Sequence, residues 1–151
     1  MKQAFGSRIL DAAARLLIPY ILLFALYVLF HGHHSPGGGF QGGTILAAAV
    51  ILIRLVRGRQ PGWGIGREQA LVLALIGVLI YASFGFIPLF FGGNFLDYGY
   101  LPLPASPAET RSLGILGIEI GVTIGVMGTM VLIFDLLTSP YWTAESDEDA
   151  R

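Results

Sequence analysis

The chain has 151 residues, of which 54% are hydrophobic and 13% charged, and its mean hydropathy is +0.71. A soluble domain usually carries about a quarter charged residues, so this composition indicates surroundings that are largely lipid. The net charge of −1 gives no indication of nucleic-acid binding. The absence of cysteine excludes disulfides, thiolate metal sites and cysteine chemistry.

Four apolar stretches predict an all-α integral membrane protein with four transmembrane helices. Each stretch is close to the roughly 20 residues that cross about 30 Å of hydrocarbon. They are expected at residues 9–30, 40–56, 70–87 and 113–137. No small-residue cleavage site follows the first stretch, which is therefore interpreted as a retained helix rather than a signal peptide. Residues 1–151 are interpreted as a single membrane domain with an acidic, cytoplasmic tail at about 143–151.

Two details of the spans lead to definite expectations. Arg54 lies near the end of the second stretch, where its long side chain is expected to extend toward the membrane surface. The third stretch is expected to stop at Pro88, because proline lacks the backbone N–H that an interior helical position needs.

Positive charge predicts the orientation in the membrane. Four spans place both termini on one side, and eight of the nine Lys and Arg residues would lie there, with only Arg111 opposite. The eight are Lys2, Arg8, Arg15, Arg54, Arg57, Arg59, Arg67 and Arg151. Because short cytoplasmic segments are enriched in Lys and Arg, the predicted orientation is N-in and C-in.

The corner between the first two spans is rich in histidine and glycine. Ser35 and Pro36 are typical of a helix start, because serine accepts bonds from the first free N–H groups and proline needs none at the first position. Glycine inside a helix costs roughly 1 kcal/mol against alanine, so the glycines that follow need a reason. They are Gly37, Gly38, Gly39, Gly42 and Gly43. Close helix packing is one explanation, and a helix start whose free N–H groups face an anion or water is the other.

Other side chains of this corner also have more than one interpretation. His31, His33 and His34 could relay protons or bind metal, but their spacing is poor for zinc and no cysteine or carboxylate lies nearby, so we predict no metal site. The alternative is a set of polar interfacial residues with a packing role. Gln41 and Thr44 lie three residues apart on one helical face and could bond a neighbouring helix.

The fourth span has two distinct faces. Glycines at steps of three and four residues form one stripe suited to close helix contact. They include Gly117, Gly121 and Gly125. Glu119 and Thr123 lie one turn apart on the other face. An acidic residue inside a membrane helix is a functional-site hypothesis by default, so Glu119 is the principal candidate for an ion or proton path, with a structural hydrogen bond as the alternative. Asp135, near the inner end, is interpreted as an interfacial anchor or a path residue.

These motifs together resemble a known family. Phe30–Gly43, with the letters FHGHHSPGGGFQGG, followed by Ile45–Ala49, looks like the signature of the MnhB/MrpB family. Gly117–Gly121 and Leu132–Asp135 resemble the last helix of the same family. Members of that family are the B-type subunits of multisubunit Mrp-type Na⁺/H⁺ antiporters.

The resemblance implies an accessory, assembly or ion-path subunit of a complex in the inner membrane of a bacterium or archaeon. The complex would exchange Na⁺ for H⁺ under the proton-motive force, with partner subunits of the A, C, D, E, F and G types around this chain in the lipid bilayer. It implies no cofactor and no catalytic residue, so the chain would be a transporter subunit and not an enzyme. One alternative is a membrane subunit of a redox complex related to respiratory complex I, such as a membrane-bound hydrogenase. Another is a purely structural scaffold.

Overall fold

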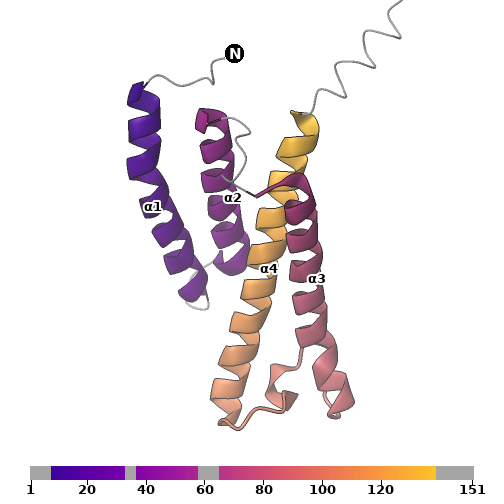
Figure 1. The fold of residues 1–151 in the computed structure, drawn as a ribbon. Coiled ribbons are helices and arrows are strands. Elements are labelled where there is room, and N and C mark those ends of the chain that lie inside the picture. Colours follow the sequence, from indigo (N-terminus) through magenta and orange to yellow (C-terminus); the bar gives the residue numbers. More distant parts are fainter. Residues whose placement is uncertain (1–7, 33–36, 58–64, 139–151) are drawn as a thin grey trace, which may run out of the picture.

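The computed structural model describes residues 8–32, 37–57 and 65–138, and helices make up most of them (Figure 1). The elements are α1 (Arg8–Phe30), α2 (Gly38–Arg57), α3 (Arg67–Phe90), the short 3-10 helix η2 (Tyr98–Tyr100) and α4 (Pro107–Leu137). The described residues contain no strand, and four of the helices are long and apolar enough to cross a membrane. The predicted all-α fold with four membrane-crossing helices is therefore confirmed.

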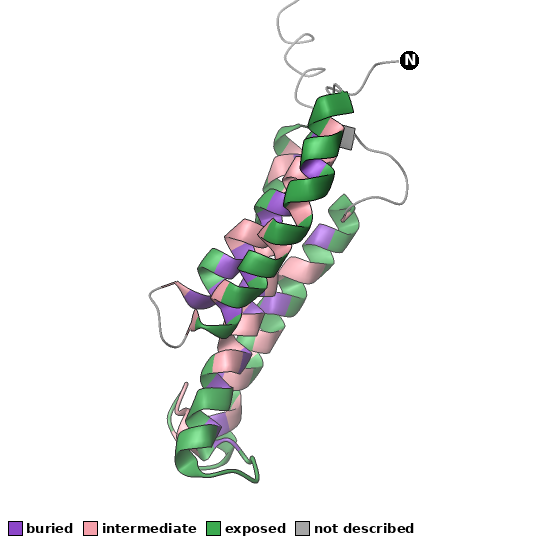
Figure 2. Cartoon of the chain, turned by 90° about the vertical axis from the view of Figure 1, so that its left-hand side faces the viewer, coloured by how far each residue is buried: buried purple, intermediate pink, exposed green. Residues whose placement is uncertain are grey.

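The four long helices stand in an open row in the order α1, α2, α4, α3 (Figure 1). The main contacts join α1 to α2, α2 to α4, and α4 to α3. Buried positions follow the seams between neighbouring helices, whereas much of the outward surface is exposed and apolar (Figure 2). Phe24 on α1 is 57% exposed and Leu79 on α3 is 65% exposed. Such faces suit a lipid environment, because lipid tails are as apolar as these side chains.

The third helix runs past the proline at which it was expected to stop. Pro88 is buried inside α3, which continues to Phe90, and the N–H groups of Phe91 and Gly93 both donate to its carbonyl. A proline so near the end of a helix removes a single intrahelical hydrogen bond, and only two residues follow it in the helix. The expectation that the helix ends at Pro88 was therefore wrong by about half a turn.

The fourth helix starts six residues before the expected position. Ser106 is its N-cap, and Pro107 occupies the first helical position. The Ser106 hydroxyl accepts a hydrogen bond from the Glu109 N–H over 3.4 Å, and the Glu109 carboxylate accepts one from the Ser106 N–H over 3.0 Å. This reciprocal pair, a capping box, satisfies two backbone donors that a helix start leaves free. The helix is 31 residues long, or about 46 Å at 1.5 Å per residue.

The corner between α1 and α2 lies beside the middle of α4 and not beside its start (Figure 1). The first residues of α2 contact α4 at Glu119 and Thr123. Glu119 is twelve residues beyond Pro107, which corresponds to roughly 18 Å along the helix. The α1–α2 corner and the connection between α3 and α4 were both expected on the outer side, and the structure places them at different levels along α4.

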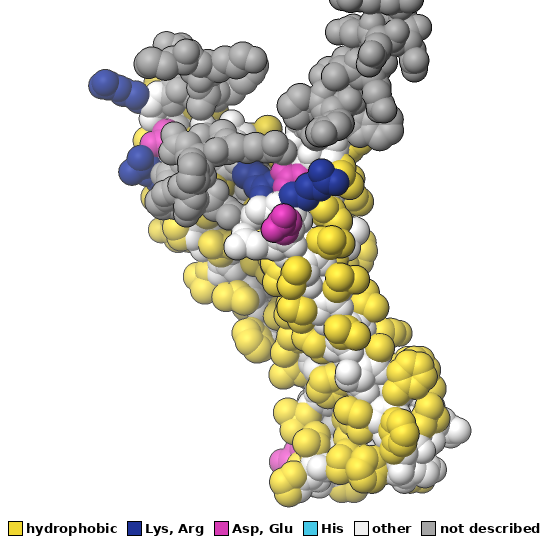
Figure 3. Space-filling model, turned by 45° about the vertical axis from the view of Figure 1, so that its right-hand side comes forward, with side chains coloured by type: hydrophobic (Ala, Val, Ile, Leu, Met, Phe, Trp, Pro, Cys, Tyr) yellow, Lys and Arg dark blue, Asp and Glu magenta, His cyan; other side chains and the backbone are white. Residues whose placement is uncertain are grey.

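Charged side chains gather at one end of the row, where α1 and α3 begin and α2 and α4 end (Figure 3). Arg15 pairs there with Asp11 over 2.8 Å, one turn apart on α1. Arg67 and Glu68 are exposed at the start of α3. The face drawn in Figure 3 is covered mainly by hydrophobic side chains over the rest of its length.

Candidate functional site

The carboxylate of Glu119 lies against the backbone of the α1–α2 corner. A Cβ atom added to Gly32 would lie 2.6 Å from Oε1 and 2.7 Å from Oε2 of Glu119, and one added to Gly38 would lie 2.6 Å from Oε1. The Oε2 atom is fully buried. Glu119 therefore projects from the middle of α4 into a space whose walls are glycine backbone.

This space lies at the start of α2, whose first residue is Gly38. The first N–H groups of a helix have no intrahelical partner, and the helix dipole places partial positive charge there. Gly37 and Gly38 have φ values of +152° and +35°, which L side chains rarely adopt. The amide of Gln41 folds over Gly37, and the Gln41 N–H donates to the Gly37 carbonyl over 3.1 Å. The sequence therefore brings a carboxylate to the positive end of a helix inside the membrane-crossing region.

Thr123, one turn beyond Glu119, joins α4 to α2. Its hydroxyl lies 3.0 Å from the Gly39 carbonyl oxygen on α2 and 2.8 Å from the Glu119 carbonyl oxygen on its own helix. The residue is 3% exposed. One hydroxyl proton is shared between two acceptors, so Thr123 fixes the α2–α4 distance at the level of the carboxylate.

The glycines at the start of α2 face two different neighbours. A Cβ on Gly39 would collide with the Glu119 backbone, and one on Gly43 would lie 2.6 Å from the Thr123 carbonyl oxygen. Gly42 faces the opposite way, where a Cβ would lie 3.3 Å from the Ala25 carbonyl oxygen on α1. The Gly39–Gly43 pair thus lies against α4 while Gly42 lies against α1, so α2 is held closely on both sides.

Two predicted contacts of the corner differ from what the structure shows or lie outside it. Thr44 was expected to bond a neighbouring helix, but its hydroxyl donates to the Phe40 carbonyl of its own helix over 2.9 Å. A threonine commonly satisfies itself in this way inside a helix. His33, His34, Ser35 and Pro36 lie outside the described residues. His31 is described: its ring stacks on Tyr27 with centroids 4.2 Å apart, and its Nδ1 atom lies 3.0 Å from the Tyr27 carbonyl oxygen.

The glycine stripe of α4 lies against α3. Phe84 lies over Gly117, where its ring occupies the space that a side chain would need. Gly121 lies against Ile80, Tyr81 and the Gly77 carbonyl. A Cβ on Gly125 would meet only ordinary contacts, the nearest being Gly77 Cα at 3.7 Å. The two faces of α4 therefore contact different helices, with the glycines on α3 and the Glu119 face on α2.

The outer end of α4 is covered by η2. Tyr98 lies against Gly114, where a Cβ would be 2.6 Å from the tyrosine Cβ. Burial, and secondly the neighbouring Tyr81, raises the pKa of the Tyr98 hydroxyl above its ordinary value of 10.0. Tyr98 is therefore uncharged near neutral pH, and the Glu119 face of α4 receives no negative charge from it.

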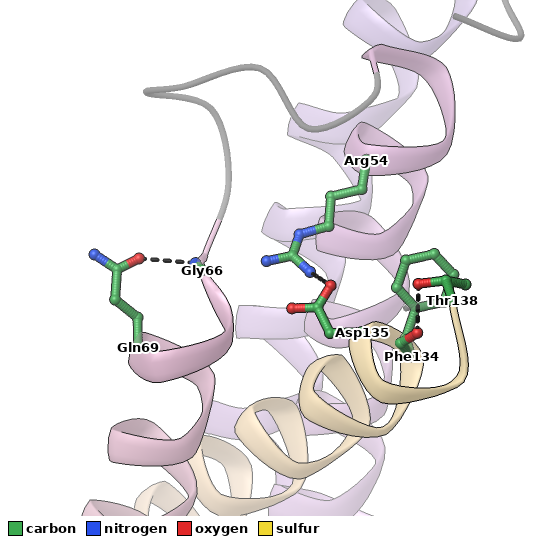
Figure 4. Close-up of polar contacts among 6 residues, drawn as sticks. All are labelled: Arg54, Gly66, Gln69, Phe134, Asp135 and Thr138. Carbon is green, nitrogen blue, oxygen red and sulfur yellow. Dashed lines mark hydrogen bonds and ion pairs between the residues drawn. The ribbon is translucent and has the colours of Figure 1, made fainter. Parts of the chain in front are cut away.

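Arg54 on α2 and Asp135 on α4 form an ion pair near the other end of the row (Figure 4). Their side chains are 9% and 3% exposed. The expectation that Arg54 extends to the membrane surface is therefore wrong, because its guanidinium turns to the carboxylate on the neighbouring helix. The sequence analysis did not pair these residues. Their positions near the inner ends of the second and fourth spans contained the signal, since residues at equal depth on two helices can meet.

These features define a class of protein: a multi-pass helical membrane protein whose helices are joined by glycine contacts and buried polar groups. Residues 9–132 match a family described as a domain related to the MnhB subunit of Na⁺/H⁺ antiporter. The chain therefore belongs to the MnhB family, as its signature predicted.

Similar proteins carry names consistent with this family. A protein of Bacillus subtilis (strain 168), whose name is that of the B-type subunit of a Na⁺/H⁺ antiporter, is 29% identical over 137 residues, which cover 85% of this chain and 96% of that protein. The putative antiporter subunit mnhB2 of Staphylococcus haemolyticus (strain JCSC1435) is 32% identical, covering 83% of this chain and 89% of its own length. The protein of the same name from Staphylococcus aureus (strain Newman) is 34% identical, with coverages of 79% and 90%.

Proposed function

We propose that this chain is a membrane subunit of a multisubunit Na⁺/H⁺ antiporter. The observation that carries the proposal is the MnhB family match over residues 9–132, which includes residues of all four membrane-crossing helices. The names of the similar proteins refer to antiporters, so they do not favour the redox-complex alternative. The partners would be the other antiporter subunits, of the A, C, D, E, F and G types, in the inner membrane of a prokaryote.

The proposed orientation has both termini in the cytoplasm. Its support is the end of the row where α1 and α3 begin, because the charged side chains of Figure 3 gather there. Arg15, Arg54 and Arg67 belong to this end, whereas Arg111 lies near the start of α4 at the other. Lys and Arg concentrate on the cytoplasmic side of membrane proteins, so this end would face the cytoplasm.

Glu119 is the proposed ion-path residue of the chain. Within the described helices it is the acidic residue farthest from a helix end, with twelve residues before it in α4 and eighteen after it. A carboxylate at that depth costs roughly 2.5–3.5 kcal/mol on insertion scales, so its presence needs a compensating role. Its place at the start of α2 supplies partial positive charge for the ionised form, which a group that exchanges a proton or a cation requires.

The described residues hold only part of such a path. Asp135 lies sixteen residues beyond Glu119, or roughly 24 Å along α4, which is far beyond a single proton transfer. Thr123 lies between them, and its hydroxyl is hydrogen-bonded to backbone carbonyls. Thr123, Asp135, His33 and His34 remain predicted path residues. We infer that water or groups of partner subunits complete the path, in agreement with an accessory subunit.

Deletion of this chain tests the proposed function. Everted membrane vesicles from cells that lack it should show no Na⁺-dependent proton movement, and expression of the chain from a plasmid should restore it. Blue-native electrophoresis of the same membranes should show the antiporter complex returning with the chain. Unchanged antiport in the deletion strain, with the remaining subunits still assembled, would contradict the proposal.

A further inference from the structure

Gly32 lies outside the glycine run that the sequence analysis singled out, yet it contacts the Glu119 carboxylate on both oxygens. A Cβ on this residue would lie 2.6 Å from Oε1 and 2.7 Å from Oε2, closer than real Cβ atoms approach such atoms. Gly32 follows the last turn of α1, and Gly38 is the first residue of α2. The carboxylate is therefore enclosed between the end of one helix and the start of the next.

The contact at Gly38 comes from the other side. A Cβ there would lie 2.6 Å from Oε1 and 3.0 Å from the Cδ atom of Glu119. The same Cβ position is already unfavourable for the backbone, because φ is +35°. Any side chain at either glycine would have to move the carboxylate or the corner. The described part of α2 has no glycine other than Gly38 that contacts the carboxylate group itself, since Gly39 contacts the Glu119 backbone.

We propose that Gly32 and Gly38 are positioning residues for Glu119, which keep its carboxylate at the N-terminal end of α2. This inference rests on the proposed function, in which Glu119 exchanges a proton or a cation. Bare backbone on both sides lets the carboxylate approach the helix start, where the free N–H groups favour its ionised form. In surroundings of low dielectric constant this interaction is screened less than in water, so a small displacement weakens it appreciably.

Few other charged or titratable groups of the described residues lie near this corner. On α1 these are Tyr27 and His31, which stack on each other. The first charged residue of α2 is Arg54, sixteen residues beyond Gly38. On α4 the neighbouring acidic residues are Glu109 and Asp135, ten and sixteen residues away along the helix. The start of α2 is therefore the main local source of positive potential among the described residues.

The test compares the pH dependence of antiport in assembled complexes that carry single substitutions. Gly32→Ala places a methyl group against the carboxylate without a positive-φ penalty. Gly42→Ala is the matched control, because Gly42 belongs to the same corner but lies against Ala25 and Leu29 of α1. Gly66→Ala is a second control, since a Cβ there would meet only the Gln69 Oε1 atom at 3.7 Å. Recovery of the complex from membranes is measured for each variant.

Gly32→Ala should move the acidic limb of the antiport profile to higher pH by about half to one pH unit, because the ionised carboxylate loses part of its stabilisation. Glu119→Asp should move the limb in the same direction, since the shorter side chain withdraws the carboxylate from the corner. Gly42→Ala should leave the profile unchanged even where recovery falls. If Gly32→Ala does not assemble, Glu119→Asp decides the question.

Two results separate this inference from the proposed function. Loss of antiport in Glu119→Gln, together with wild-type profiles in Gly32→Ala and Glu119→Asp, would overturn the positioning role and leave the ion-path role intact. Wild-type antiport in Glu119→Gln would overturn the ion-path role and the inference with it. A residual activity in Glu119→Gln that Gly32→Ala does not shift further would support the inference, because coupled residues are not additive.

Discussion

The hydroxyl of Thr123 on α4 lies 3.0 Å from the carbonyl oxygen of Gly39 on α2, to which it donates a hydrogen bond. The bond lies one turn from Glu119 and is buried. Between membrane helices such bonds contribute on average about 0.6 kcal/mol and at most about 1.7 kcal/mol. The geometry therefore assigns Thr123 a share in holding α2 against α4, in addition to its predicted place on the ion path.

Substitution of Thr123 separates these two roles. Thr123→Val keeps the side-chain shape and removes the hydroxyl, so it should lower the stability of the assembled complex by about 1 kcal/mol, whereas Thr123→Ser should keep the bond. The measurement is the detergent concentration at which the purified complex releases this chain. Antiport per assembled complex should stay near the wild-type value for both. A large loss of antiport in Thr123→Val at full assembly would instead support the ion path.

The sequence was sufficient to predict the four membrane-crossing helices, because long apolar stretches have few alternatives in lipid. It was less sufficient for helix ends. The Ser106–Glu109 segment contains a capping box that the composition of the loop obscured, and Pro88 was treated as a stop although a proline near a helix end removes only one bond.

Contacts between helices were predicted less well than helices. The periodicity of the last span gave its two faces, and the structure supplied the neighbours, α3 for the glycine stripe and α2 for Glu119. Periodicity states which residues share a face but not which helix that face meets. Arg54 and Asp135 were therefore considered separately, and Gly32 was not considered at all.

The buried ion pair between Arg54 and Asp135 predicts a pattern of loss and rescue. Asp135→Asn leaves the guanidinium buried without its counter-charge, and removal of one partner of a buried pair costs about 3–5 kcal/mol. Recovery of the chain in membranes should fall for Asp135→Asn and for Arg54→Leu. The double variant Arg54→Leu/Asp135→Leu should recover much of the loss, because no buried charge remains. Equal recovery in all four proteins would show that the pair contributes nothing to assembly.

The close contact of α3 with α4 predicts opposite outcomes for two facing glycines. A Cβ on Gly77 would collide with the backbone of Gly125, and it would lie 2.6 Å from the Gly121 carbonyl oxygen. A Cβ on Gly125 would have its nearest contact at 3.7 Å. Gly77→Ala should therefore force the helices apart and reduce recovery of the complex, whereas Gly125→Ala should be tolerated. The comparison uses the same substitution in both helices, and similar recoveries would contradict the helix contact described.

The orientation can be tested in the natural background, because the chain has no cysteine. Single cysteines are introduced at Glu68, in the first turn of α3, and at Ala105, just before α4; both positions are exposed. In right-side-out vesicles a membrane-impermeant thiol reagent should label Ala105→Cys and not Glu68→Cys, and everted vesicles should show the reverse. Labelling with the opposite sidedness would place both termini outside.

Bulky residues at the start of α2 should act on assembly. Gly39→Val would drive two methyl groups into the Glu119 backbone, since even a single Cβ collides there. The complex should then be recovered at a small fraction of the wild-type level, as measured by blue-native electrophoresis. Normal recovery with loss of transport would favour the alternative interpretation of the glycine run, in which a loose helix start serves the ion path.

The most direct test of the ion-path role is antiport by Glu119→Gln in everted vesicles. The amide has nearly the shape of the carboxylate but neither ionises nor exchanges a proton, so Na⁺-dependent proton movement should fall to a small fraction of the wild-type rate with the complex assembled. Glu68→Gln is the control, because Glu68 is an exposed acidic residue at the start of α3 and should leave antiport unchanged. Wild-type rates in Glu119→Gln would contradict the ion-path role and return Glu119 to a structural one.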